Sequence, residues 1–87
     1  MSVTVRLPRV LTQVVGIGPK HDADGHNLGE VLDDLFAREP SLKSHLLDEE
    51  GRIRPHILVF VDATRAGIDS PVGPHSEVQV LQAVSGG

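Results

Sequence analysis

Apolar and polar residues alternate near both ends of the chain, as in a strand with one buried face. Val3, Val5 and Leu7 alternate with polar residues near the start, and residues 77–81 repeat the pattern near the end. Residues 57–61 are apolar at every position, so both faces of that strand need cover or a partner. These segments predict three strands of one sheet.

A different period appears between residues 27 and 40 and predicts the main helix. Asn27 stands three residues before Glu30, the spacing of a helix N-cap with a reciprocal carboxylate. Arg38 places a cation near the C-terminal end, and Pro40 prevents continuation. A shorter helical turn is expected over residues 41–47. The apolar face of the main helix comprises Leu28, Val31, Leu32, Leu35 and Phe36.

The remaining segments are assigned from turn residues and short apolar runs. Residues 10–15 are interpreted as a second strand, and the polar residues 20–26 as a loop. A tight turn at 62–64 leads to a short edge strand at 65–68, and residues 69–76 form a loop. The expected fold is α+β, a mixed sheet of four to five strands with one main helix across one face.

Composition limits the function classes. The chain has 87 residues, enough for a single domain over residues 1–87. It has no cysteine, which excludes thiolate chemistry, and a net charge of -4, which argues against nucleic acid and favours a basic protein surface as partner. No apolar run is long enough for a membrane span and no signal segment is evident, so a cytoplasmic location is expected.

No motif of a metal site or an enzyme active site stands out. Asp22, Asp24, Asn27 and Glu30 resemble part of a calcium loop, but the glycine offset and the closing glutamate do not fit. The five histidines have no metal-ligand spacing, the glycines form no phosphate-binding motif, and no serine lies in a nucleophile elbow. A polar loop that leads into a capped helix is the simpler interpretation.

Two features suggest interaction with another protein. Leu58 and Phe60 point away from the helix-covered face of the sheet and, with Leu81, form a candidate docking patch unless loops cover them. Residues 82–87 are uncharged and end in Gly86 and Gly87, so we expect a flexible tail. Such a tail is either a functionless end or a terminal carboxylate that a partner activates, because an α-carboxylate is inert at neutral pH.

Four motifs together resemble the MoaD/ThiS family of ubiquitin-like sulfur carriers. They are NLGEVL at residues 27–32, VFVD at 59–62, VQVL at 78–81 and AVSGG at 83–87. The resemblance covers nearly the whole chain and implies the β-grasp fold. The length, the AVSGG ending and the segment 65–67 are closest to carriers of the CysO type, which serve cysteine synthesis.

The resemblance implies a protein co-substrate rather than an enzyme. Gly87 would be adenylated by a ubiquitin-activating-type enzyme that uses ATP and Mg²⁺, and sulfur from a sulfurtransferase or sulfide would convert it to a thiocarboxylate. Val84, Ser85 and Gly86 would enter the partner active site, and a client biosynthetic enzyme would receive the sulfur. The chain itself is expected to bind no cofactor or metal.

Three alternatives remain at this point. The chain resembles, more distantly, the small subunit of molybdopterin synthase. A ubiquitin-like chain of this kind can also be a modifier that is ligated through Gly87 to lysines of other proteins. The third alternative is a β-grasp adaptor whose tail is never activated.

Overall fold

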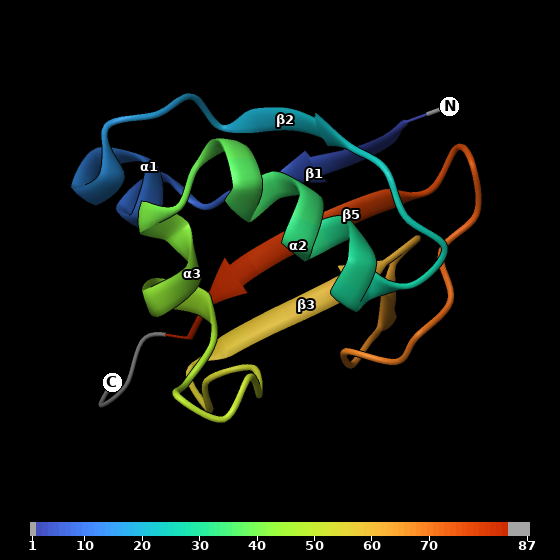
Figure 1. Ribbon diagram of the computed structural model, residues 1–87. Helices are drawn as coiled ribbons and strands as arrows, with labels where there is room; N and C mark the ends of the chain where they lie inside the picture. Colours follow the sequence, from blue (N-terminus) through green and yellow to red (C-terminus); the bar gives the residue numbers. More distant parts are fainter. Residues whose placement is uncertain (1, 84–87) are drawn as a thin grey trace.

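The computed structural model describes residues 2–83, which form one five-stranded mixed sheet packed against helices (Figure 1). The strand order is β2-β1-β5-β3-β4. The central strands β1 and β5 are parallel, and every other neighbouring pair is antiparallel. The strands are β1 (Val3–Arg6), β2 (Lys20–Ala23), β3 (Ile57–Val61), β4 (Thr64–Arg65) and β5 (Glu77–Gln82).

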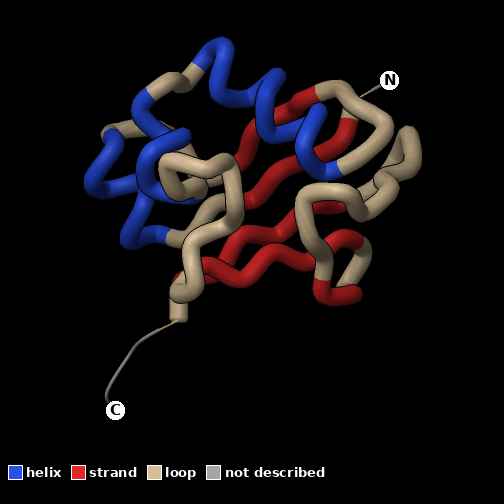
Figure 2. Tube along the Cα trace, turned by 60° about the horizontal axis from the view of Figure 1, so that its bottom comes forward, coloured by secondary structure: helices blue, strands red, loops and turns tan. Residues whose placement is uncertain are grey.

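One long helix covers one face of the sheet, and two short helices lie at one end of it (Figures 1 and 2). The core lies between this helical layer and the sheet, and valine and leucine supply most of its side chains. Within residues 2–83, no helix is both long and apolar enough to cross a membrane. The helices are α1 (Arg9–Val15), α2 (Leu28–Arg38) and α3 (Ser41–Leu46).

Helix α2 confirms the sequence prediction at both ends and along its apolar face. Its five predicted core residues are all buried. The Asn27 side chain accepts a hydrogen bond from the Glu30 N–H at 2.9 Å, as expected for an N-cap. The Glu30 carboxylate accepts from the backbone N–H of His26 instead of that of Asn27, so the reciprocal bond is displaced by one residue. Arg38 pairs with Asp34 at 3.1 Å in the last turn.

The predicted strand at residues 10–15 is wrong, because this segment is helix α1. Its valines suggested a strand, but Pro8 precedes the helix and Gly16 ends it in the left-handed conformation, with φ of 81°. Leu11 is the buried residue of the helix and anchors one of its faces in the core. Tertiary packing therefore overrides the weak strand preference of valine.

The predicted loop at residues 20–26 is also partly wrong, because residues 20–23 form strand β2. This strand is polar apart from Ala23, and it pairs with β1 from Val3↔Ala23 to Arg6↔Lys20. Backbone hydrogen bonds rather than apolar side chains hold it at the sheet edge, which explains why alternation did not reveal it. The edge strand expected at 65–68 is shorter, because β4 covers only Thr64–Arg65.

A network of hydrogen bonds fastens the β3–β4 turn to the start of β5. The Asp62 carboxylate accepts from the Glu77 N–H at 2.9 Å and from the Ser76 hydroxyl at 2.7 Å. These two bonds hold the pKa of Asp62 below its usual value, the Glu77 N–H having the larger effect. Asp62 and Ala63 both have positive φ, at 49° and 69°, as a two-residue hairpin turn requires.

Candidate functional site

The C-terminal strand places the root of the expected tail at one end of the sheet. β5 lies between β1 and β3, and Gln82 pairs with Ile57. The Ala83 N–H then donates to the His56 carbonyl at 2.8 Å. The tail was expected over residues 82–87, but Gln82 belongs to β5 and Ala83 is hydrogen-bonded to the residue before β3. Val84, Ser85, Gly86 and Gly87, the predicted tail and acceptor residues, lie outside the described residues.

The predicted docking patch consists of Leu58, Phe60 and Leu81, and the structure places all three on the sheet face opposite the helices. Their strand neighbours, Val59 and Val80 among them, are buried on the helical side. Leu58 lies directly opposite Leu81 in the β3–β5 register. Leu58 and Phe60 are partly buried, and Leu81 is 37% exposed. The patch is therefore a partly covered apolar surface close to the root of the tail.

Charged and polar residues surround this patch on the same sheet face. Phe60 lies opposite Gln79 on one side and Arg65 on the other. Farther across the sheet, Arg6 forms an ion pair with Glu77 at 3.2 Å. An apolar centre with a polar border is the usual anatomy of a protein interface.

Sequence reasoning missed a second exposed apolar surface, on α1. Val10 is 47% and Val14 is 65% exposed. The segment had been assigned to a strand, so the spacing of these two valines on a helix could not be used. Pro8 before the segment and Gly16 after it were the signals that could have indicated a helix.

The residues that resemble part of a calcium-binding loop lie in and around the β2–α2 connection, where most of them make structural hydrogen bonds. Asp24 donates its backbone N–H to the Asp34 carboxylate, and the Asn27 and Glu30 side chains cap α2. The side chain of Asp22 is exposed on β2. Across residues 2–83, no group of three or more His, Asp or Glu side chains has the arrangement of a metal site.

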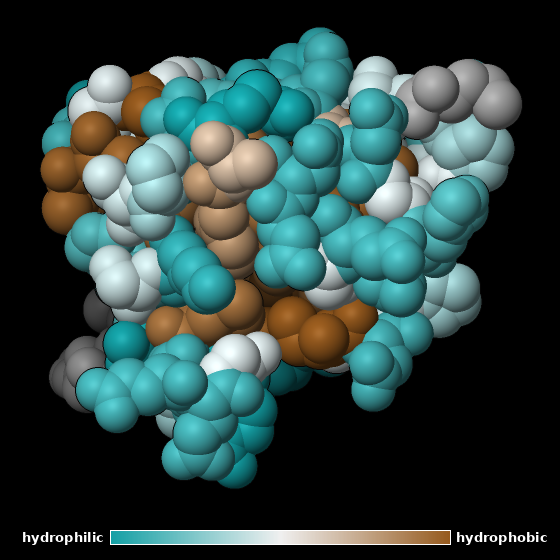
Figure 3. Space-filling view, viewed as in Figure 1, coloured by the Kyte–Doolittle hydropathy of each residue, from teal (hydrophilic) through white to brown (hydrophobic). Residues whose placement is uncertain are grey.

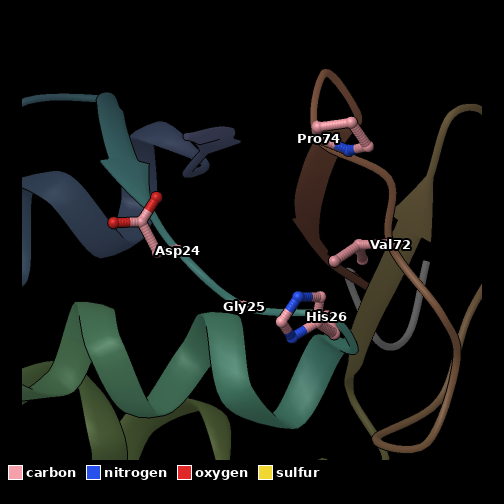
Figure 4. A pocket seen from close by; sticks show the side chains of 5 residues that line it. All are labelled: Asp24, Gly25, His26, Val72 and Pro74. Atoms are coloured by element: carbon pink, nitrogen blue, oxygen red, sulfur yellow. The ribbon is translucent and has the colours of Figure 1, made fainter. Parts of the chain in front are cut away.

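A groove of about 450 Å³ lies between the β2–α2 connection and the loop that precedes β5. Its lining includes Asp24, Gly25 and His26 on one side and Val72 and Pro74 on the other (Figure 4). The side chains of Asp24 and His26 extend from different points of the connection and do not converge on a common centre. Because β5 runs from this loop toward Ala83, the groove and the root of the tail lie at opposite ends of the sheet.

Comparisons with known proteins agree with this geometry. No family model matches the chain. It is 28% identical over 93 residues to the sulfur carrier protein CysO of Mycobacterium tuberculosis, and the match covers all of both chains.

Solved structures of sulfur carrier and modifier proteins also match the chain over nearly its full length. A chain in the crystal structure of the Amycolatopsis orientalis BexX/CysO complex matches with a TM-score of 0.87 and 29% identity, over 98% of this chain and 99% of that one. SAMP1 of Haloferax volcanii, a small archaeal modifier protein, matches with a TM-score of 0.82 and 28% identity over the full length of both chains.

The fold and these matches define the class as ubiquitin-like β-grasp proteins, as the sequence predicted. Within that class, the comparisons confirm the resemblance to sulfur carriers of the CysO type. The comparisons therefore indicate a sulfur carrier or a related ubiquitin-like protein. Sulfur carrier proteins are small carriers rather than enzymes.

Proposed function

We propose that this chain carries sulfur as a thiocarboxylate on Gly87. The observation that carries the proposal is the full-length similarity to the sulfur carrier protein CysO. The geometry supports it, because the tail follows directly after β5, and the end of β5 lies beside an apolar patch on which a partner can dock.

The chemistry requires activation of the terminal carboxylate by a separate enzyme. A ubiquitin-activating-type adenylyltransferase, with ATP and Mg²⁺, would join the Gly87 carboxylate to AMP and release pyrophosphate. A sulfide nucleophile would then attack the acyl carbon and expel AMP, which leaves a thiocarboxylate. Glycine has no side chain to obstruct this attack.

The domain would supply recognition rather than catalysis. Leu58, Phe60 and Leu81 would dock on the activating enzyme, while Val84, Ser85 and Gly86 would enter its active site. A client biosynthetic enzyme would then take the sulfur. The occurrence of a relative in a complex of BexX and CysO supports a second protein partner of this kind.

The test is the intact mass of the chain purified from the organism that encodes it, before and after incubation with ATP, Mg²⁺, sulfide and the activating enzyme. Exchange of one oxygen for sulfur at Gly87 is the expected result. Deletion of Gly87, or addition of one residue after it, should abolish the exchange without changing the melting temperature, because a terminal glycine buries almost no apolar area. An unmodified terminus in the presence of an enzyme that loads a CysO protein would indicate an adaptor and refute the proposal.

The similarity to SAMP1 favours one further candidate, a protein modifier. In that case Gly87 would be joined to lysine side chains of other proteins. Peptide mass spectrometry of the same cells distinguishes the two functions, because a modifier leaves isopeptide-linked C-terminal remnants on lysines. Such remnants without any thiocarboxylate would favour the modifier.

A further inference from the structure

Helix α1 presents an apolar face to solvent. Val10 and Val14 are one helical turn apart and lie on the same face, whereas Leu11 is 4% exposed on the other. Within residues 2–83, the exposed large apolar side chains are these two valines and Leu81. Most of the surface of Val14 contributes nothing to folding, because 65% of it remains in water.

This face lies at the end of the molecule where β5 ends. β1 and β5 are parallel, and α1 follows β1, so α1 sits near the C-terminal ends of both central strands. Figures 1 and 2 both place α1, α3 and the end of β5 at the same end of the sheet. In Figure 3, hydrophobic side chains gather over α1 at the left edge of the molecule.

The length of the tail brings this end close to any enzyme that acts on Gly87. The last backbone hydrogen bond of the described chain joins the Ala83 N–H to the His56 carbonyl. Four residues follow Ala83, and a fully extended chain spans at most about 3.5 Å per residue, or roughly 14 Å in total. An active site that reaches Gly87 must therefore lie within that distance of Ala83, so its entrance meets this end of the domain.

The segment that contains α1 has a charge opposite to that of the whole chain. Residues 1–21 contain Arg6, Arg9 and Lys20 and no acidic residue, while all 12 acidic residues follow from Asp22 onward. In the described part of the chain, Arg6 pairs with Glu77, and neither Arg9 nor Lys20 takes part in an ion pair. The net charge of -4 favoured a basic partner surface, but Arg9 at the start of α1 and Lys20 after its end favour an acidic surface opposite α1.

We infer that the exposed face of α1, formed by Val10 and Val14 with Arg9 at its edge, docks on the entrance of the adenylating enzyme's active site. The matching surface on the enzyme is apolar and bordered by carboxylates. This inference rests on the proposed function, because it identifies the partner surface of the same tail. A second copy of this chain is a poorer occupant, since two α1 faces would bring their cations together.

Steady-state adenylation tests the inference, with the activating enzyme that modifies the wild-type chain and with pyrophosphate release as readout. V10Q/V14Q should raise KM for the chain about tenfold or more and leave kcat nearly unchanged, because apolar docking area is lost and the tail is intact. Arg9→Gln should raise KM less and weaken its dependence on ionic strength. His75→Glu changes the formal charge equally at the opposite end and serves as the control.

The adenylation results distinguish a failure of docking through α1 from a failure of the proposed sulfur-carrier function. If the wild-type chain is adenylated and V10Q/V14Q and Arg9→Gln have wild-type KM, the inference is wrong and the function stands. If the wild-type chain is not adenylated, the proposed function fails and the inference fails with it. A concentration-dependent dimer that V10Q/V14Q disrupts, with KM unchanged, would assign the face to a second copy. Thermal melting verifies that each variant is folded. If V10Q/V14Q does not fold, the KM of Arg9→Gln alone decides whether the α1 face docks on the enzyme.

Discussion

Leu81 is partly buried in the fold and belongs to the proposed docking patch, so its exposure predicts how the effect of a truncation divides between folding and docking. It is 37% exposed, so nearly two thirds of its surface is already covered in the free chain. Complete burial of a leucine side chain contributes about 1.5–3 kcal/mol. The covered part thus corresponds to about 1–2 kcal/mol of folding free energy, and the exposed part to about 0.5–1 kcal/mol on docking.

Leu81→Ala should therefore lower the free energy of unfolding by about 1–2 kcal/mol and raise KM for adenylation about two- to sixfold. The value of kcat should stay the same, because the tail is unchanged. Urea unfolding measures the first quantity and steady-state adenylation measures the second. His75→Ala, at an exposed residue of the loop that precedes β5 and at the opposite end of the sheet from Leu81, is the control.

Two results would refute this reasoning about Leu81. An unchanged KM would show that the sheet face stays uncovered when the enzyme binds. A loss confined to kcat would show that Leu81 acts on the position of the tail instead of on docking.

Two further predictions concern the β3–β4 turn. The pKa of Asp62 is lowered in the folded chain, so its carboxylate stabilises the fold above about pH 4, and this contribution is lost as the pH falls through the folded pKa. The difference in urea stability between wild type and Asp62→Asn should thus shrink below about pH 4, and a difference independent of pH would contradict the assignment. Ala63→Gly should raise the unfolding free energy by up to about 1 kcal/mol, because φ is 69° there and a side chain is strained in that region; a lower melting temperature would show that the turn carries no such strain.

The elements that were predicted correctly have strong side-chain patterns. Helix α2 has a buried face at helical spacing and a cap at Asn27, and β3 and β5 have apolar faces that need a core. The position of Leu58 and Phe60 on the uncovered face followed from β3, because the strand is apolar on both faces and a single helical layer covers only one of them.

The elements that were missed depend on contacts that a single sequence does not display. Strand β2 buries only Ala23, and its place is set by backbone pairing with β1. Helix α1 has seven residues, too few to show a clear period, and its valines suit a strand equally well. The apolar face of Val10 and Val14 was missed for the same reason, since it exists only when the segment is helical.

The most direct test of the sulfur-carrier function is the mass of the C-terminal peptide after incubation with ATP, Mg²⁺, sulfide and the activating enzyme. We predict one sulfur in place of one oxygen at Gly87, and no such exchange when Gly87 is deleted. A peptide that keeps both oxygens, under conditions in which the same enzyme loads a CysO protein, would contradict the account.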